Sequence, residues 1–214
     1  LGGAIARALF AKGFRIVLHF HKDEKPLRRL VNDTRAAAVV AANLEDGQEV
    51  QRMLARIGEV DVLVHTVGGF IYKPIAETTA REFEDCIRNN LFTAWNCIHG
   101  VLPGMRQRKF GRIIVFGSTG CDELTSRPLT TPYYIAKSGL LSVVRSLARS
   151  QAVSGITINM ISPGVLPHGV VPQTEEPVPV ISFDEVARAV LFCLAVDNDK
   201  VNGANLEISG GWRP

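Results

Sequence analysis

The chain has few cysteines, few aromatic residues and no long hydrophobic run. Its four cysteines lie far apart without CxxC spacing, which argues against disulfide bonds and a zinc site and favours a reducing compartment. No stretch reaches the ~18 consecutive apolar residues of a membrane span. The net charge of +3 comes from scattered side chains, so nucleic acid is not an expected partner. We therefore expect a cytoplasmic protein with no metal site and no membrane contact.

What is present is a regular alternation of short apolar runs and longer segments of helical period. At 214 residues and 46% hydrophobic content, one domain over residues 1–214 can bury a substantial core. Runs rich in Val and Ile read as strands buried on both faces, and helices between them imply right-handed crossovers. We predict an α/β fold of three layers, with a doubly wound parallel sheet. The expected strands cover residues 14–20, 36–44, 60–67, 112–118, 156–162 and 204–209.

Local signals place some boundaries of the helices. Thr79 with Glu82, and Ser182 with Glu185, form capping boxes that are typical of helix starts. Residues 163–179 contain five prolines and are expected to form neither a regular helix nor a central strand. In a sheet of this kind, ligands bind beyond the carboxyl ends of the strands, so the residues after each strand are the candidates for a site.

A serine, a tyrosine and a lysine stand out at these positions. Ser118 ends an expected strand, and Tyr133 and Lys137 have the i, i+4 spacing that places both on one face of a helix. A nearby ammonium lowers the phenol pKa from its usual value of about 10. Such a pair can exchange a proton with a carbonyl or alcohol oxygen while the serine holds that oxygen. Taken alone, the three residues also fit an exposed helix pair and a turn serine.

Six segments together resemble the short-chain dehydrogenase/reductase family, and the resemblance covers essentially the whole chain. The overall look is nearest to its 3-oxoacyl-(acyl-carrier-protein) reductases. The resemblance implies a Rossmann-like fold and an oxidoreductase. The segments are "LGGAIA" (1–6), "NNL" (89–91), "GRIIVFGS" (111–118), "YYIAK" (133–137), "ITINMISPGV" (156–165) and "VNGANLEISGGW" (201–212).

The resemblance also implies roles for four catalytic residues. Ser118 would hydrogen-bond the substrate oxygen and Tyr133 would be the general acid in reduction. Lys137 would lower the pKa of Tyr133 and bind the nicotinamide ribose, and Asn90 would hold a water that links Lys137 to solvent. Without the other motifs, Asn90 would be interpreted as a helix residue whose side chain hydrogen-bonds to the neighbouring backbone.

The resemblance further implies a nicotinamide dinucleotide along the strand ends. The position of the acid in NAD-preferring members is Phe20, followed by His21 and Lys22, whose charge could neutralise a 2′-phosphate. We therefore expect NADP(H), although Asp23 lies close by and Lys22 also fits a solvated strand end. The expected cofactor-binding residues are Leu1, Gly2, His21, Lys22, Asn43, Leu44, Thr66, Val67, Gly68, Tyr133, Lys137, Pro163, Gly164 and Leu166.

Three positions depart from the family pattern. Residues 65–68 read HTVG instead of NNAG, Asn43 replaces an aspartate, and His168 replaces a threonine that usually contacts the cofactor's carboxamide. None of them touches the proton-transfer residues. The expected lid, residues 168–179, is short and rich in proline, which suits an open pocket for a carrier-bound or planar bicyclic substrate.

Several functions stay open at this point. The leading hypothesis is NADPH-dependent reduction of a small-molecule or carrier-bound carbonyl resembling a 3-oxoacyl thioester. A pterin, a quinone or a sugar ketone are alternative substrates, and an idle dinucleotide-sensing or scaffold protein is an alternative of another class. The resemblance implies a homotetramer or homodimer built through the helices around residues 90–105 and 133–151 and through the carboxyl-terminal strand.

The first nine residues, "LGGAIARAL", resemble the second half of a phosphate-binding turn that runs into a helix. Gly2 falls where the third glycine of that turn would stand. A central strand that was missing from a parallel sheet would leave backbone groups unpaired. We therefore expect an apolar strand and a Gly-rich turn upstream of Leu1 in the natural protein.

Overall fold

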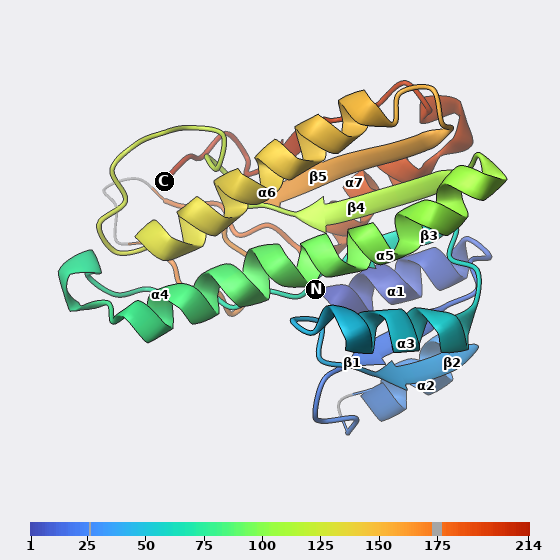
Figure 1. The fold of residues 1–214 in the computed structure, drawn as a ribbon. Coiled ribbons are helices and arrows are strands. Elements are labelled where there is room, and N and C mark those ends of the chain that lie inside the picture. Colours follow the sequence, from blue (N-terminus) through green and yellow to red (C-terminus); the bar gives the residue numbers. More distant parts are fainter. Residues whose placement is uncertain (26, 173–176) are drawn as a thin grey trace.

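Six parallel strands alternate with helices in the computed structural model, which describes residues 1–25, 27–172 and 177–214 (Figure 1). Each strand lies within or next to one of the six segments predicted from the sequence, and most are shorter than predicted. The strands are β1 (Val17–Phe20), β2 (Ala38–Ala41), β3 (Val62–His65), β4 (Gly111–Phe116), β5 (Ile156–Pro163) and β6 (Asn205–Ile208).

The strands form two sheets instead of one. β1 pairs with β2, and the other four follow the order β3-β4-β5-β6, all in parallel. β1 and β3 do not pair with each other, so one edge of each strand has no partner strand among the described residues.

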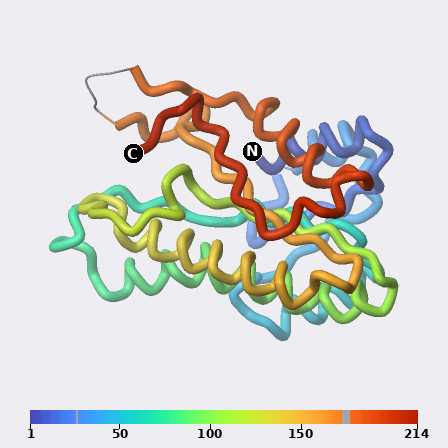
Figure 2. The backbone as a smooth tube through the Cα atoms, turned by 90° about the horizontal axis from the view of Figure 1, so that it is seen from above, coloured from blue at the N-terminus to red at the C-terminus, as the bar shows by residue number. Residues whose placement is uncertain are grey.

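Helices cover both faces of the four-stranded sheet, which gives the three predicted layers. Helices α3, α5 and α6 lie on one side, and α1 and α7 pack together on the other (Figures 1 and 2). Two 3-10 turns and one π-helical turn add to the helices. The bounds are α1 (Gly2–Ala11), α2 (Leu27–Thr34), α3 (Gly47–Ile57), α4 (Ala80–Ile87), α5 (Thr93–Arg108), α6 (Thr131–Ser150), α7 (Phe183–Leu194), η1 (Ile75–Glu77), the π-helical η2 (Arg88–Phe92) and η3 (Val196–Asn198).

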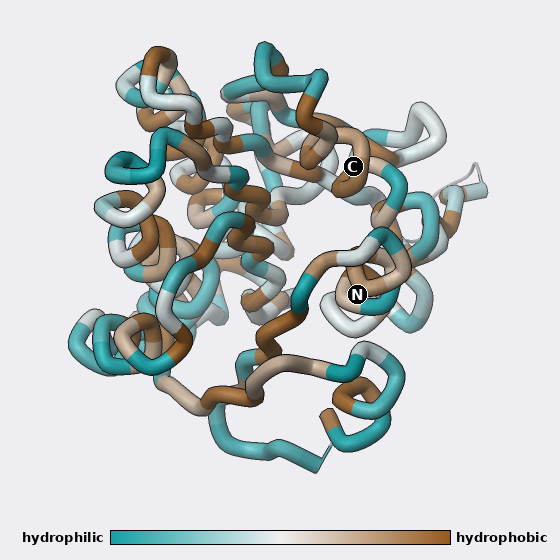
Figure 3. Tube along the Cα trace, turned by 90° about the vertical axis from the view of Figure 1, so that its right-hand side faces the viewer, coloured by the Kyte–Doolittle hydropathy of each residue, from teal (hydrophilic) through white to brown (hydrophobic). Residues whose placement is uncertain are grey.

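The alternation of side chains along β4 divides the core between the two helical layers. Ile113 and Val115 pack into the cluster formed with α5 and α6, whereas Ile114 and Phe116 pack into the cluster with α1 and α7. Successive strand residues point to opposite faces, so a strand covered on both sides must be apolar throughout. The hydropathy view shows the same inward placement of apolar segments (Figure 3).

Both predicted capping boxes are present. The Thr79 hydroxyl accepts from the Glu82 N–H at 3.2 Å, while the Glu82 carboxylate accepts from the Thr79 N–H at 2.8 Å. Ser182 and Glu185 make the same reciprocal bonds at the start of α7. These bonds satisfy amide groups that a helix start would otherwise leave free.

The proline-rich stretch contains no helix in its described part. β5 runs to Pro163, and beyond it Val165 and Val180 form an isolated parallel bridge with each other, outside the named strands. Residues 173–176 of the expected lid lie outside the described residues. The short length of the lid is therefore still a prediction.

Candidate active site

Three of the four predicted catalytic side chains gather beyond the end of β4. Ser118 lies two residues after that strand, and Tyr133 and Lys137 occupy the first two turns of α6. Lys137 is 4% exposed and its ammonium donates to the Phe116 carbonyl at 2.8 Å. This bond holds α6 against the carboxyl end of β4 and fixes the buried charge beside Tyr133.

The fourth residue, Asn90, lies in the π-helical turn between α4 and α5. It is fully buried, and its amide donates to the carbonyls of Cys86 at 2.9 Å and Gly69 at 2.8 Å. Its Oδ1 has no hydrogen-bond partner among the described residues. A π-helical turn frees carbonyl groups from the helix ladder, and here the Asn90 amide takes up one of them.

Gly68 brings Asn90 and Lys137 together. A Cβ at position 68 would collide with the Asn90 Oδ1 and would lie 3.4 Å from the Lys137 ammonium. Only a glycine fits here, because any side chain would displace the amide or the ammonium. The unpaired Asn90 oxygen and the Lys137 ammonium thus both lie next to the same backbone position, Gly68.

The pKa of Tyr133 shifts in the direction opposite to the one expected from the sequence. Burial raises the pKa of Tyr133 above its ordinary value, and the Tyr134 phenol adds to that rise. The Lys137 ammonium lies over the Tyr133 ring, 5.4 Å from its centroid, and donates to a backbone carbonyl. Desolvation of the phenolate therefore outweighs the attraction of the ammonium. Burial also lowers the pKa of Lys137 to about 8.

A second tyrosine, which has no role in the sequence-based predictions, belongs to the site. The Tyr134 hydroxyl lies 3.3 Å from Ser118 Oγ and donates to the Thr119 carbonyl at 3.0 Å. The Arg127 guanidinium covers the Tyr134 ring at 3.9 Å from its centroid. The doubled tyrosine in "YYIAK" was the available signal, but spacing alone does not show that the second ring turns back toward the serine.

The amino end of α1 lies against the end of β3. A Cβ at Gly2 would come within 2.8 Å of the Thr66 hydroxyl. Leu1 is the N-cap residue, with no side-chain capping bond, and the first turn contains no acidic residue. The partial positive charge of a helix start favours an anion, and these features leave that charge unopposed by α1 itself.

The remaining predicted cofactor-binding residues follow the carboxyl ends of several strands, but they do not all contact one another. Pro163 ends β5, the Gly164 N–H donates to Ile208, and Leu166 packs partly buried against the core. Val67 is exposed beyond β3. His21 and Lys22 lie exposed just after β1, the strand that pairs with β2.

Two predicted cofactor-binding residues, Asn43 and Leu44, are already engaged within the protein. The Asn43 Oδ1 accepts from the Glu45 N–H at 3.1 Å, and Leu44 is buried in the core. The Leu44 carbonyl accepts from the Asn96 amide at 2.9 Å. Asn43 therefore has one side-chain lone pair committed to a local turn.

His65, the first residue of the altered HTVG segment, is buried at the end of β3. Its Nε2 has no hydrogen-bond partner among the described residues. Burial lowers the pKa of His65 to about 3, with the Lys137 charge as a smaller cause. The ring is therefore neutral at physiological pH.

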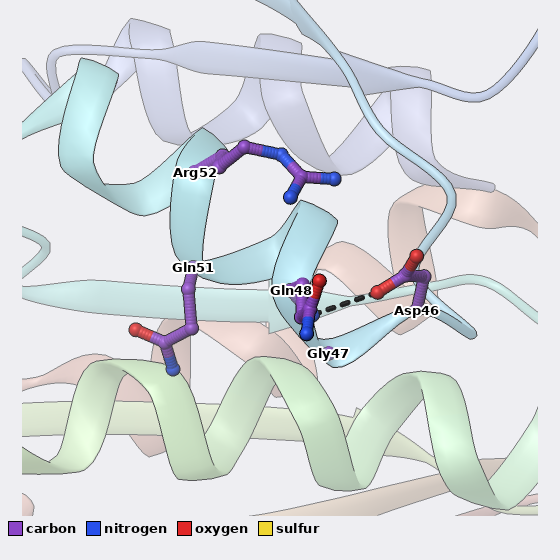
Figure 4. A pocket seen from close by; sticks show the side chains of 5 residues that line it. All are labelled: Asp46, Gly47, Gln48, Gln51 and Arg52. Atoms are coloured by element: carbon purple, nitrogen blue, oxygen red, sulfur yellow. Dashed lines mark hydrogen bonds between the residues drawn. The ribbon is translucent and has the colours of Figure 1, made fainter.

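A shallow surface hollow lies away from the four predicted catalytic residues. It is lined by Asp46, Gly47, Gln48, Gln51 and Arg52 at the start of α3, where Asp46 caps the helix (Figure 4). None of the four predicted catalytic residues lines it. Within the described ranges, no group of three or more His, Cys, Asp or Glu could hold a metal ion, and no helix is long and apolar enough to cross a membrane.

Known proteins resemble the chain along nearly its whole length. The 3-oxoacyl-(acyl-carrier-protein) reductase FabG of Staphylococcus epidermidis is 28% identical, over 99% of this chain and 93% of that protein. The D-beta-hydroxybutyrate dehydrogenase of Rhizobium meliloti is 25% identical, over 99% and 94%. A solved structure from Agrobacterium tumefaciens, provisionally described as a gluconate dehydrogenase, has a TM-score of 0.89 at 27% identity, covering 98% of this chain and 90% of its own.

A family model described as short chain dehydrogenase matches residues 1–176. That span includes the four gathered side chains and most of the parallel strands. Members of this family use nicotinamide dinucleotides as redox cofactors. Because the match covers most of the chain, the protein belongs to the short-chain dehydrogenase family of oxidoreductases.

Proposed function

We propose that the protein reduces a carbonyl group to an alcohol with NADPH, on a substrate resembling a 3-oxoacyl thioester. The observation that carries this proposal is the convergence of Ser118, Tyr133, Lys137 and Asn90 at the ends of β3 and β4. The relatives named 3-oxoacyl-(acyl-carrier-protein) reductase support the substrate class.

The raised pKa of Tyr133 suits a general acid in the reductive direction. When bound, NADPH supplies the hydride. Tyr133 then donates its proton to the oxygen as negative charge develops there, and burial keeps the phenol protonated until that moment. Ser118 holds the same oxygen by a hydrogen bond. Lys137 and a water on the Asn90 Oδ1 return a proton to Tyr133.

The residues present fit a dinucleotide. Lys137 has three donors and spends one on Phe116, which leaves two for ribose hydroxyls. The uncapped start of α1, with Leu1 and Gly2 beside Thr66, suits a pyrophosphate. His21 and Lys22 would bind the 2′-phosphate that distinguishes NADPH. The remaining proposed contacts are Asn43, Leu44, Val67, Gly68, Pro163, Gly164 and Leu166.

A sugar-acid ketone is the second candidate substrate, because the Agrobacterium tumefaciens neighbour carries a gluconate dehydrogenase description. An idle sensing protein is less well supported, since it has no need for four gathered catalytic groups. We also propose a homotetramer or homodimer. Exposed Phe92 and Trp95 near or on α5, and Ile135 on α6, are compatible with such an interface. The cytoplasmic location stays a prediction.

The experiment has a binding stage and a turnover stage. NADPH and NADH are titrated against the purified protein by fluorescence, and then a 3-oxoacyl thioester and a keto sugar acid are added while NADPH oxidation is followed. Tyr133→Phe should bind NADPH and lose turnover by a factor of at least about a hundred. Tyr72→Phe, the same change at an exposed tyrosine, is the matched control. Full activity in Tyr133→Phe would refute the mechanism, and NADPH binding without any turnover would favour the sensing protein.

A further inference from the structure

We propose that Phe70 is a specificity-determining residue that packs against the alkyl chain on the reacting carbonyl carbon of the substrate. This inference rests on the proposed function, because it places the substrate carbonyl at Tyr133. It narrows the substrate class to ketones with an apolar chain beside the carbonyl. It disfavours the keto sugar acid, whose carbonyl has hydroxylated neighbours.

The Phe70 ring contacts the ring of the proposed acid directly. The ring centroids of Phe70 and Tyr133 lie 4.9 Å apart with the ring planes at 82°, which is an edge-to-face arrangement. The Tyr72 ring is a more distant neighbour of Phe70, at 6.3 Å. A substrate oxygen that accepts from the Tyr133 hydroxyl lies about 2.8 Å from it. The groups on the carbonyl carbon then lie beside the Tyr133 ring, which Phe70 borders.

Hydrogen bonds fix the backbone on both sides of Phe70. The Gly69 N–H donates to the Asn89 side chain in η2 at 2.8 Å. The Lys73 N–H donates to the Leu129 carbonyl, shortly before α6, at 2.7 Å. Phe70 is therefore held between η2 and the start of α6, the two elements that also carry the proposed catalytic asparagine and tyrosine. Its place beside the acid is set by the backbone as well as by the ring contact.

The surface around Phe70 suits an alkyl chain better than a polyol. Phe70 is 51% exposed, and Val67 before it and Ile75 after it are also exposed apolar side chains. These three side chains contain no hydrogen-bonding group, so sugar hydroxyls packed there would lose hydration without a replacement partner. The ammonium of Lys73 is paired with the Glu82 carboxylate at 2.9 Å. An alkyl chain gains from burial at the same place.

The length of the substrate chain is the variable that tests this contact. The purified protein is assayed with NADPH and the N-acetylcysteamine thioesters of 3-oxobutanoic, 3-oxohexanoic and 3-oxooctanoic acid. Each fully buried methylene contributes about a factor of four to binding, and Phe70 covers one side of the chain. Phe70→Ala should therefore lower kcat/KM for the longest thioester about tenfold and for the shortest less than about threefold, mainly through KM.

Three further variants separate this contact from a general effect on folding. Phe70→Leu keeps an apolar side chain and should retain most of the preference for the longer chain. Phe70→Asn has a side chain of similar size to leucine but polar, and it should lose that preference as alanine does. Phe192→Ala removes a ring of nearly equal exposure, 50%, from α7 and should leave kcat/KM for all the thioesters unchanged.

Binding without turnover separates this inference from the proposed function. With the oxidised cofactor bound, no hydride can be transferred to a ketone, so calorimetry measures the Kd of each thioester directly. The Kd should fall as the chain lengthens, and Phe70→Ala should raise the Kd of the longest thioester about tenfold. If this pattern occurs but no ketone is reduced with NADPH, the contact stands and the proposed function fails.

Several results would overturn the inference. One is an equal loss of kcat/KM for short and long chains in Phe70→Ala, or no loss at all, while the thioesters are still reduced; the proposed function would then stand without this contact. Another is that no thioester binds, or that the unchanged protein prefers a keto sugar acid to all of them. A change of oligomeric state in Phe70→Ala, measured by light scattering, would place the ring between copies of the chain instead.

Discussion

The two sheets of the molecule differ in how deeply they are buried. Every residue of β4 and β5 in the four-stranded sheet is buried, whereas each strand of the β1–β2 pair has at least one exposed residue. β4 and β5 are central strands with a neighbour on each side and helices on both faces, while β1 and β2 have one neighbour each. The four-stranded sheet is therefore the rigid part on which a site can be built.

The predicted site residues follow the same division. Asn90 and Lys137, packed against the four-stranded sheet, are buried and fixed by backbone carbonyls. His21 and Lys22, after β1, are exposed. Proton transfer requires fixed distances and a desolvated phenol, whereas attraction of a phosphate requires only charge. The difference in burial thus matches the difference in the proposed tasks.

The largest expected effect is in the buried part. Lys137→Met should lower the rate of carbonyl reduction by a factor of about 100 to 10,000, because it removes the ammonium beside Tyr133. Lys12→Met, the same change at an exposed position near the end of α1, should leave the rate unchanged. Steady-state kinetics on both variants check this. Equal rates in the two variants would contradict a role for Lys137.

Lys137→Met also tests how stability and activity depend on pH. The pKa of Lys137 is lowered to about 8 from an ordinary 10.5, so between these values the unfolded chain binds more protons than the folded one. Stability should therefore rise with pH across that window, by about 3 kcal/mol in total. The proposed activity should decline above about pH 8 as the ammonium is lost. Lys137→Met should lack the rise, which urea unfolding at several pH values would reveal.

The stability of the two sheets is compared by one substitution made in each. Val115 in β4 is 0% exposed and Val17 in β1 is 39% exposed. Val115→Ala should lower the free energy of unfolding by about 2 kcal/mol, and Val17→Ala by less than about 0.5 kcal/mol. Urea denaturation measures both. A similar loss at the two positions would show that the β1–β2 pair is packed as tightly as the larger sheet.

The smallest expected effect concerns the exposed part. Lys22→Ala should raise the KM for NADPH about tenfold and leave that for NADH nearly unchanged, because only NADPH carries the 2′-phosphate. The difference should shrink at high salt, which screens an exposed charge. Lys12→Ala serves as the control. An equal change for both cofactors would place Lys22 outside the phosphate site.

Sequence patterns predicted the elements well and the site only in outline. The alternation of apolar runs gave all six strands, and both capping boxes lie at observed helix starts. The irregular helix turn and the break between the two sheets could not be predicted from these patterns. The π-helical turn around Asn90 and the separation of β1 from β3 depend on packing between distant segments. The pKa of Tyr133 was predicted in the wrong direction because spacing shows the ammonium nearby but not the extent of burial.

The amino-acid sequence by itself determined the parallel α/β fold, the order of its elements and the placement of Ser118, Tyr133 and Lys137 at strand and helix ends. These follow from periodicity and short-range spacing, which act within a few residues along the chain. Only the tertiary structure decided that Asn90 and Lys137 meet beside Gly68, and that the Tyr134 hydroxyl contacts Ser118. Hydrogen-bond direction and desolvation depend on groups far apart in the chain, so they exist only once the layers are packed.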